Sequence, residues 1–420
     1  MIADEKQLDS LLLGRAQSLG SRLFDISDYL ASCISRSGIT GIQRVQEAVT
    51  RELLFLHVQV AFVMVDEVFG RVWTFRREDL LAVLSNDNPA LAHHDLETRG
   101  RAAEKARDRA QFHTLSRNDL LINAGAFWSA QYGSRFENYL FKSGCQFIPV
   151  VYDLIPAERP DLCEEQTVKD FIHSLPRVFR QASRIFAISE FTRNRILVYA
   201  KEHQLTIPEI EVMPLAHQFK SPLNSRLSTF DICDLFCADE GFVLCVGTLE
   251  PRKNQLRLAE IWARLAKDIV NMPTLLIVGK MGWIKPADIA RIKELAHSSK
   301  KIVLAHHIMD EALASLYQQC LFTVFIPEVE GWGLPVGESL SFGKICLAAN
   351  VGAVSEVGGD LALYINPANN SEIDLALRSL IVGVRGRRIL ERRIAQEFHA
   401  RNWSDVANDL LTSTQMILRK

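Results

Sequence analysis

The chain has 420 residues, of which 48% are hydrophobic and 23% are charged, and its formal net charge is −2. This length and hydrophobic content suffice for two packed domains, and the charge provides no general attraction to nucleic acid or anionic lipid. No segment approaches the ~20 uninterrupted apolar residues of a membrane span. The eight cysteines include no Cys-x-x-Cys pair, which favours free thiols in a reducing cytoplasm over zinc sites or disulfides.

Residues 1–20 lack the basic-then-apolar layout of a signal peptide and predict a short polar or amphipathic helix. Beyond them, short apolar runs alternate with helical patterns. Because the runs lack polar alternation, they predict strands buried on both faces of parallel sheets, joined by crossover helices. The predicted strands are Val58–Val65, Leu120–Asn123, Phe147–Val151, Arg184–Ile188, Phe242–Val246, Thr274–Val278, Ile302–Ala305 and Leu321–Ile326. The clearest helices are Glu97–Arg109, Asn254–Ile269, Ala287–Ser298 and Asp310–Cys320.

This alternation predicts an α/β fold with two sheets, and therefore two domains. Polar residues around Ser221–Ser228 indicate the linker, which gives an N-terminal domain at residues 1–228 and a C-terminal domain at 229–395. Residues 396–420 contain an apolar-periodic helix that follows Trp403 and ends at Leu418.

Two adjacent cations, Arg252 and Lys253, follow a predicted strand and a turn that contains Pro251. Ligands of α/β sheets bind at the loops that leave the carboxyl ends of the strands. These cations can neutralise a diphosphate, Arg252 with a planar fork and Lys253 as a point charge. The alternative is a solvated basic loop.

The segment Glu330-Gly-Trp-Gly-Leu-Pro-Val-Gly-Glu338 places two carboxylates eight positions apart around a glycine-rich turn. Gly331 and Gly333 lack a Cβ, so the backbone can turn sharply and approach a ligand closely. Pro335 suits the first turn of a helix, whose outward-pointing amides attract phosphate oxygens. A sugar nucleotide, with an anionic centre and hydroxyls at both ends, satisfies this arrangement. The alternative is a pair of ordinary loop and helix-cap acids.

Three segments in this order resemble the retaining glycosyltransferases of family GT4. Glu330–Glu338 resembles the E-x7-E motif of that family, and Val246–Asn254 resembles its G-T-x-x-x-R-K-N strand-loop. Thr40–Val45 resembles the N-terminal loop of a bacterial polysaccharide subgroup that is mannosyltransferase-like. The match is dense over roughly residues 240–365 and looser before them.

The resemblance implies the GT-B architecture: two Rossmann-like domains, a cleft between them and a C-terminal helix that crosses back to the first domain. A nucleotide-sugar donor then sits mainly on the second domain. Glu338 is expected to bind the ribose hydroxyls and Glu330 to lie beside the donor sugar. Arg252, Lys253 and the amides after Gly333, beginning with Leu334, are expected to stabilise the departing diphosphate without a metal.

Further donor contacts follow from the same resemblance. Gly247 belongs to the strand-loop motif, and Gly279 and Lys280 follow the next strand, where Gly279 permits close approach of the nucleotide. Ile308 lies where the family reads the base with backbone groups. Trp283 fits a core or lid position better than a base-stacking platform.

In the first domain, Gly41 is expected to approach the donor phosphates closely and Arg44 to supply a charge there. Asp153 is expected to contact the acceptor or the sugar. Tyr152 stands where relatives commonly carry a histidine, which leaves that role open. Ser189 is expected to cap a helix and, by resemblance, to lie on the acceptor or phosphate side.

The resulting prediction is a retaining, metal-independent glycosyltransferase with no cofactor. It transfers a sugar from a nucleotide diphosphate to a carbohydrate or lipid-linked saccharide acceptor, with GDP-mannose as the first candidate donor. UDP-glucose and a dTDP-deoxysugar stay open, as does peripheral contact with the cytoplasmic face of the inner membrane. Two alternatives are a GT-B sugar-nucleotide epimerase, which needs no acceptor, and a non-catalytic binding protein with this fold. No nucleic-acid partner is expected.

Overall fold

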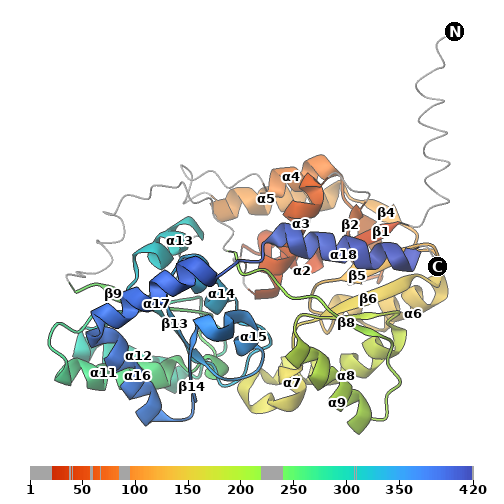
Figure 1. Cartoon of the computed structure of the whole chain (residues 1–420). Helices are drawn as coiled ribbons and strands as arrows, with labels where there is room; N and C mark the ends of the chain where they lie inside the picture. Colours follow the sequence, from red (N-terminus) through yellow and green to blue (C-terminus); the bar gives the residue numbers. More distant parts are fainter. Residues whose placement is uncertain are drawn as a thin grey trace.

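Two parallel sheets, each covered by helices, organise the chain (Figure 1). The computed structural model describes residues 21–36, 39, 41–56, 60–66, 68–84, 95–218, 240–306, 308 and 310–418. Within these residues the first sheet has eight strands and the second has six. The predicted α/β class with two sheets is therefore confirmed.

The first sheet has the strand order β4-β3-β2-β1-β5-β6-β7-β8. Strand β3 pairs antiparallel with both β2 and β4 near one edge, and the other pairs are parallel. Its strands are β1 (Arg22–Asp25), β2 (Val60–Val65), β3 (Val72–Thr74), β4 (Gln111–His113), β5 (Leu120–Asn123), β6 (Gln146–Val151), β7 (Ile185–Ala187) and β8 (Ile210–Val212).

The helices of this domain connect successive strands and cover both faces of the sheet (Figure 1). They are α2 (Ser27–Ile34), α3 (Gly41–Phe55), α4 (Arg77–Leu84), α5 (Asp95–Asp108), η2 (Ala130–Tyr132), α6 (Ser134–Ser143), α7 (Ile155–Glu158), η3 (Pro160–Leu162), α8 (Glu165–Gln181) and α9 (Glu190–Glu202).

The second sheet is parallel throughout and has the order β11-β10-β9-β12-β13-β14. Its strands are β9 (Phe242–Val246), β10 (Thr274–Val278), β11 (Ile302–Ala305), β12 (Thr323–Phe325), β13 (Cys346–Ala349) and β14 (Leu363–Ile365). Its helices are η4 (Pro251–Lys253), α11 (Gln255–Asp268), α12 (Pro286–Ser299), α13 (Asp310–Gln319), α14 (Leu334–Ser341), α15 (Val354–Gly358), η5 (Gly359–Leu361), α16 (Asn370–Val382) and α17 (Val384–Glu397).

The last helix, α18 (Trp403–Leu418), leaves the second domain and packs on α3 of the first (Figure 1). The Arg22 Nε atom donates a hydrogen bond to the Thr414 Oγ1 atom at 3.0 Å, and Ser413 bonds Glu211 at the end of β8. The predicted C-terminal helix that crosses back to the first domain is thus confirmed.

Burial on both faces explains why the central strands could be predicted. Strands β5, β10 and β13 have only buried residues, as expected for parallel strands between two helical layers. Strands β5, β9, β10 and β11 have the predicted bounds. Strands β1, β3, β4, β8, β13 and β14 were not predicted; each has only three or four residues, a length at which some strands, such as β5 and β11, are recognised from their apolar residues and others are not.

Several sequence predictions fall outside the described residues or cross an observed element. The predicted helix at residues 1–20 and the linker at Ser221–Ser228, with the domain boundary after residue 228, lie outside the described part of the chain. The predicted boundary after residue 395 falls inside α17. Among the described helices, none combines the length and the apolar character needed to cross a membrane.

Candidate active site between the two domains

The order of the second sheet places a crevice between the loops that follow β9 and β12. Strand β10 lies on one side of β9 and β12 on the other, so the chain reverses its direction of travel across the sheet at this point. Loops at such a switch point diverge, and ligands of open α/β sheets bind in the crevice that they leave. The loop after β9 carries Arg252 and Lys253, and the loop after β12 carries Glu330.

Arg252 and Lys253 both bind one oxygen of Glu330. The Nη1 atom of Arg252 donates to the Oε2 atom at 2.8 Å, and the Nζ atom of Lys253 contacts the same atom. The three side chains are 12–16% exposed, so solvent screens this cluster weakly. Burial acts to raise the pKa of Glu330, but Arg252 and Lys253 outweigh it and lower the pKa, so the carboxylate stays ionised.

Asp153, from the loop after β6, completes this cluster from the first domain. A Cβ on Gly331 would come within 2.2 Å of the Tyr152 carbonyl oxygen and 2.9 Å of the Asp153 Cβ atom, so only glycine fits at this contact. Burial raises the pKa of Asp153 to about 6, against the opposing charge of Arg252. This carboxyl can therefore exchange a proton near neutral pH.

Glu338 lies on α14 and is almost fully buried. Its two oxygens accept hydrogen bonds from different domains: Oε1 from Arg44 Nη2 at 2.7 Å and Oε2 from the Tyr317 hydroxyl at 2.8 Å. Gly333 precedes α14 with φ of +111°, which favours glycine, and Pro335 lies in the first turn as predicted. Arg44 is thus placed on Glu338 rather than on the Arg252–Glu330 cluster.

The predicted glycines of the other donor loops also meet. A Cβ on Gly279 would lie 2.0 Å from the Gly247 carbonyl oxygen, which holds the loops after β9 and β10 against each other. His306 bonds the Gly279 carbonyl oxygen through its Nδ1 atom at 2.6 Å. Ile308 is half-buried against the cluster that contains Tyr317, the partner of Glu338.

Comparison with known proteins places this site in a family. Residues 235–392 match the family described as glycosyl transferases group 1. This match covers the second sheet and most of its helices. The matched residues include Arg252, Lys253, Glu330 and Glu338.

Curated relatives are about one quarter identical to this chain over the aligned residues. The serotype-specific mannosyltransferase WbdA of Escherichia coli is 25% identical over 240 residues, which are 54% of this chain and 29% of that protein. The O-antigen chain mannosyltransferase B of Escherichia coli is 27% identical over 210 residues, which are 49% of this chain and 54% of that protein. The chain therefore spans about half or less of the curated relatives it matches.

Solved structures resemble this chain over nearly its whole length. A glycosyltransferase from Rickettsia africae has a TM-score of 0.61 at 14% identity, covering 96% of this chain and 99% of that one. Anabaena HepE in complex with UDP-glucose has a TM-score of 0.63 at 13% identity, covering 94% and 99%. At this identity the likeness shows the fold alone, and it confirms the GT-B architecture.

The remaining predicted residues frame the cluster without entering it. Gly41 begins α3 with φ of +43°, and a Cβ there would meet no atom within 4 Å. The side chain of Lys280 is half-buried, and burial lowers its pKa. Leu334 is the first residue of α14, directly after Gly333. Thr40, which opens the N-terminal motif, lies outside the described residues.

A buried polar network at the first domain's own switch point was missed by sequence reasoning. Strand β1 has β2 on one side and β5 on the other, and the ends of β1 and β5 bring Asp25 and Asn123 together at 2.9 Å. The Tyr132 hydroxyl also donates to Asp25 at 2.7 Å. Burial raises the pKa of the neighbouring Asp28 to about 6. The carboxylates at the end of the unpredicted strand β1, in Phe-Asp-Ile-Ser-Asp, were the available signal.

Tyr152 connects this network to the second domain. Its hydroxyl donates to the Ala124 carbonyl oxygen at 2.8 Å, and its own carbonyl oxygen lies against Gly331. Burial raises the pKa of Tyr152, so the hydroxyl stays protonated. Its hydroxyl is therefore engaged inside the first domain.

Polar contacts hold the two domains together around the site. Ser189 caps α9 as predicted, accepting from the Thr192 amide at 3.0 Å, and its hydroxyl also lies 3.1 Å from the Gly331 carbonyl oxygen. Glu356 of the second domain accepts the amides of Glu190 and Phe191 at the start of α9. Trp283, predicted to be a core or lid residue, is 39% exposed and so is not a core residue; its indole donates to the Leu162 carbonyl oxygen of the first domain at 2.9 Å.

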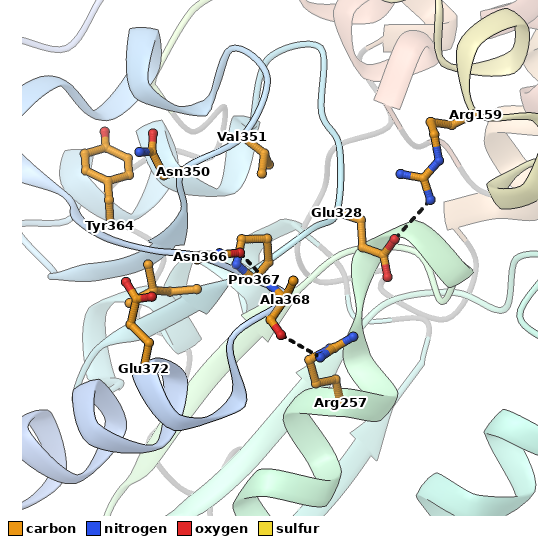
Figure 2. Close-up of a pocket in the computed structure, with 11 residues that line it drawn as sticks. Arg159, Arg257, Glu328, Asn350, Val351, Tyr364, Asn366, Pro367, Ala368 and Glu372 are labelled. Atoms are coloured by element: carbon orange, nitrogen blue, oxygen red, sulfur yellow. Dashed lines mark hydrogen bonds and ion pairs between the residues drawn. The ribbon is translucent and has the colours of Figure 1, made fainter.

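A cavity of about 700 Å³ opens beside the Glu330 loop (Figure 2). Its wall includes Glu328, two positions before Glu330, and Arg159 of the first domain, which form an ion pair at 3.2 Å. The rest of the wall follows β13 and β14 and the start of α16. Sequence reasoning did not find this cavity, since no motif marks it.

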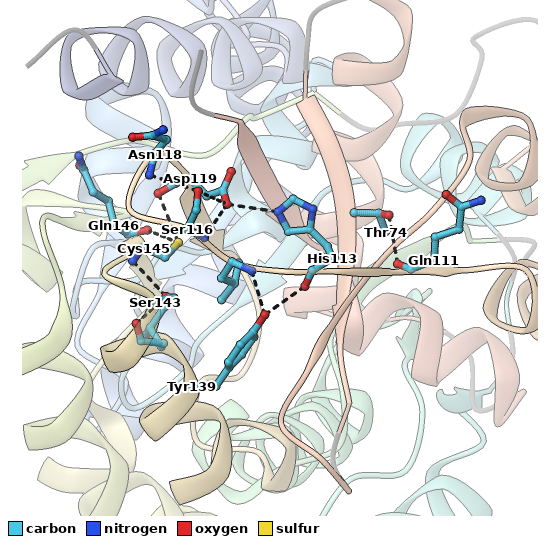
Figure 3. A network of polar contacts seen from close by, with 12 residues as sticks. Thr74, Gln111, His113, Ser116, Asn118, Asp119, Tyr139, Ser143, Cys145 and Gln146 are labelled. Atoms are coloured by element: carbon cyan, nitrogen blue, oxygen red, sulfur yellow. Dashed lines mark hydrogen bonds and ion pairs between the residues drawn. The ribbon is translucent and has the colours of Figure 1, made fainter. Parts of the chain in front are cut away.

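Two other kinds of site can be judged from the geometry. Across the described part of the chain, no group of three or more His, Cys, Asp or Glu side chains is arranged to hold a metal ion. His113, Asp119 and Ser116 meet in the first domain (Figure 3), but the Ser116 hydroxyl donates to Asp119 at 3.0 Å rather than to the histidine. Because Asp119 also accepts the Ser116 amide, this group stabilises a turn and lacks the serine–histidine bond of a nucleophilic triad.

Proposed function

We propose that the protein is a retaining glycosyltransferase that transfers mannose from GDP-mannose to a saccharide acceptor of a surface polysaccharide. The observation that carries this proposal is the contact of Glu330 with Arg252 and Lys253 at the switch point, facing Asp153 of the other domain. The group 1 family match and the names of the relatives, both mannosyltransferases, support the activity and the choice of donor.

The two cations suit a departing diphosphate. Arg252 and Lys253 share one oxygen of Glu330 and keep further N–H donors, which can bind the oxygens of a diphosphate. The Leu334 amide at the start of α14 lies on the same loop as Glu330 and can add a donor to a phosphate oxygen. These groups supply the charge stabilisation that the proposal assigns to the protein rather than to a metal.

Glu330 is suited to the sugar end of the donor. Its lowered pKa keeps it ionised, and a carboxylate beside the anomeric carbon stabilises the positive charge that develops there. In the proposed front-face reaction, the bond from the anomeric carbon to the phosphate oxygen breaks. A bond from that carbon to the acceptor oxygen forms on the same face. The acceptor proton passes to the departing phosphate oxygen, so the step needs no protein nucleophile.

Glu338 is proposed to bind the ribose. Each of its oxygens accepts a single side-chain bond, from Arg44 and from Tyr317, and a carboxylate oxygen can accept a second. Because the side chain is only 3% exposed, the donor reaches it when the first domain and Arg44 move away. The proposal therefore includes domain opening for donor entry and closure over the bound donor.

A lipid-linked acceptor and contact with the inner membrane are part of the proposal. An aromatic patch on the first domain supports it: Phe69 is 62% exposed and Phe112 is 47% exposed. The Arg71 guanidinium lies over both rings, at 5.6 and 5.4 Å from their centres. Exposed aromatic rings with an arginine between them suit the interface of an anionic bilayer. The cytoplasmic location is proposed on the same grounds.

An acceptor assay tests the activity directly. The full-length protein is incubated with GDP-mannose in EDTA, with and without short α-manno-oligosaccharides, and NMR follows the anomeric configuration of new linkages. The proposal predicts acceptor-dependent α-linked product without added metal. An isomerised nucleotide sugar formed from donor alone would instead identify an epimerase. Donor binding with neither product would identify a binding protein.

A further inference from the structure

We propose that the cavity between Arg159, Glu328, Asn350 and Glu372 binds a neutral, hydroxyl-rich saccharide: the acceptor sugars that precede the one receiving mannose. This inference rests on the proposed function, because it assigns the acceptor's further sugars to a site of their own. The cavity is distinct from the expected donor site, since it shares no residue with Gly247, Gly279, Ile308 or Glu338.

Position separates the cavity from the donor. Its wall follows β13 and β14, which lie on one side of the switch point, while β10 and β11 lie on the other. The Ala353 amide, just after the β13 end of the wall, donates to the Glu330 carbonyl oxygen at 3.1 Å. The Glu328 amide donates to the Arg252 carbonyl oxygen at 2.8 Å. A ligand in this cavity is therefore separated from the proposed transfer centre by a single loop.

Charge argues for a neutral ligand. Both arginines of the wall are engaged: Arg159 binds Glu328 at 3.2 Å and Asp161 at 2.8 Å. Arg257 binds Asn254 at 3.1 Å and Asn370 at 2.8 Å. The wall's two carboxylates, Glu328 and Glu372, equal these two cations in number, so the wall has no surplus positive charge with which to attract a phosphate or diphosphate.

Free hydrogen-bonding groups argue for hydroxyls. The Asn350 amide and the Glu372 carboxylate face the cavity, and within the described part of the chain neither side chain has a hydrogen-bond partner (Figure 2). An amide offers two donors and an acceptor, and a carboxylate accepts from several hydroxyls. Planar groups of this kind match pairs of neighbouring sugar hydroxyls.

Packing provides a surface for the sugar ring. Tyr364 lines the same wall. Its hydroxyl packs closely on Gly358, where an added Cβ would lie 2.4 Å from it, and this contact holds the ring in place. Val351 and Pro367 add apolar contact. A volume of about 700 Å³ with aromatic contact and a few placed polar groups is typical of a ligand site.

The cavity also joins the two domains. Arg159 comes from the loop between α7 and η3 of the first domain, and the other named residues come from the second. A saccharide that contacts both sides of the Arg159–Glu328 pair would bind the closed arrangement more tightly than an opened one. Acceptor binding would thereby favour the closure that assembles Glu330 and Asp153.

Binding of neutral saccharides tests this site without relying on transfer. Isothermal titration measures the affinity of the full-length protein for tetrasaccharides of α-linked mannose, α-linked glucose and β-linked galactose, and for the matching monosaccharides. We expect at least one tetrasaccharide to bind more tightly than its monosaccharide. In the double variant Asn350→Ala with Glu372→Gln, its binding should weaken about tenfold, as the loss of two hydrogen bonds implies.

The control variant Glu294→Gln changes an exposed carboxylate on α12 and should bind the tetrasaccharide as the unchanged protein does. Thermal unfolding checks that each variant is folded. Unweakened binding in the folded double variant would overturn the proposal, and so would the absence of binding to every tetrasaccharide. Titration with GDP-mannose on the same samples reports separately on the proposed function, whose failure would leave saccharide binding in place.

Discussion

The two domains use the same topological position in different ways. At the second domain's switch point, Arg252 and Lys253 bind Glu330, and Arg252 also pairs with Glu250 at 2.8 Å, so two cations face two carboxylates there. At the first domain's switch point, Asp25 is buried among hydroxyl and amide partners, Ser27, Asn123 and Tyr132, and no arginine or lysine bonds it. Burial raises the pKa of Asp25, whereas neighbouring cations lower the pKa of Glu330.

This difference indicates which substrate each domain suits. A site that holds an arginine and a lysine can exchange its carboxylate partners for an anion such as a diphosphate, whereas the Asp25 network has no cation to offer among the described residues and its polar groups bond one another. The same α/β topology thus gives both domains a switch point, and the charges placed there differ. Each of the following substitutions changes one of the two domains, or the contact between them.

Loss of the arginine should have the largest effect. Arg252→Ala leaves Glu330 with one cation and removes a phosphate donor, so transfer should fall about 10²- to 10³-fold. Steady-state kinetics with GDP-mannose measures this loss. Arg252→Lys keeps the charge but not the planar fork, and should retain more activity. Equal activity in both variants and the unchanged protein would contradict the assigned role.

Forcing the domains apart should have the next largest effect. Gly331→Ala puts a Cβ within 2.2 Å of the Tyr152 carbonyl oxygen, so the contact between the two switch points must open. We expect a loss of about 1–3 kcal/mol in the free energy of unfolding and a marked fall in kcat. Gly386→Ala, where a Cβ meets no atom within 4 Å, is the matched control. Chemical denaturation measures the free energy of unfolding of both variants. Equal values for the two would contradict this prediction.

The titration of Asp153 should give a smaller effect with a defined sign. Burial raises its pKa to about 6 from an ordinary value near 4. The folded state therefore holds a proton that the unfolded state releases across this window, and stability falls as the pH rises through it. Asp153→Asn removes this cost and should stabilise the protein by about 2 kcal/mol above pH 6, but not below pH 4.

Thermal unfolding at pH 4 and pH 7.5 compares Asp153→Asn with Asp108→Asn, an exposed control. A gain in melting temperature that is the same at both pH values would show that the carboxyl does not titrate in this range.

The aromatic patch should give the smallest effect. Phe69→Ser with Phe112→Ser removes two exposed rings and should weaken co-sedimentation with vesicles that contain anionic lipid about threefold to tenfold. Transfer to a water-soluble acceptor should be unchanged, because the patch lies away from the Glu330 loop. Ile389→Ser, on α17 of the second domain and 51% exposed, is the control. Unchanged vesicle binding would remove the patch from the proposal.

The sequence predicted what local patterns determine. The two α/β sheets follow from uninterrupted apolar runs, and the Glu330–Glu338 turn follows from glycines and a proline whose conformational roles are local. The contact of Arg252 with Glu330 could also be predicted, because both residues lie on loops that leave the carboxyl ends of strands in the same sheet.

Contacts across the two domains were beyond a local pattern. Arg44 was predicted to lie by the donor phosphates, yet it bonds Glu338, because the position of α3 relative to α14 depends on how the domains pack. Strand β1 has only four residues and was not predicted; Asp25 ends this strand and Asp28 follows in α2. The residues of the cavity at Asn350 and Glu372 come from several segments, among them the ends of β12, β13 and β14. No single stretch of sequence therefore predicts the cavity.

The most direct test of the central claim is the transfer rate of Glu330→Gln with GDP-mannose, measured beside its affinity for GDP. The amide keeps the shape of the side chain but cannot stabilise positive charge at the anomeric carbon. We predict that kcat falls by about 10²-fold or more, while the folded variant still binds GDP through Arg252 and Lys253. Turnover equal to that of the unchanged protein would contradict the role of Glu330 and the account built on it.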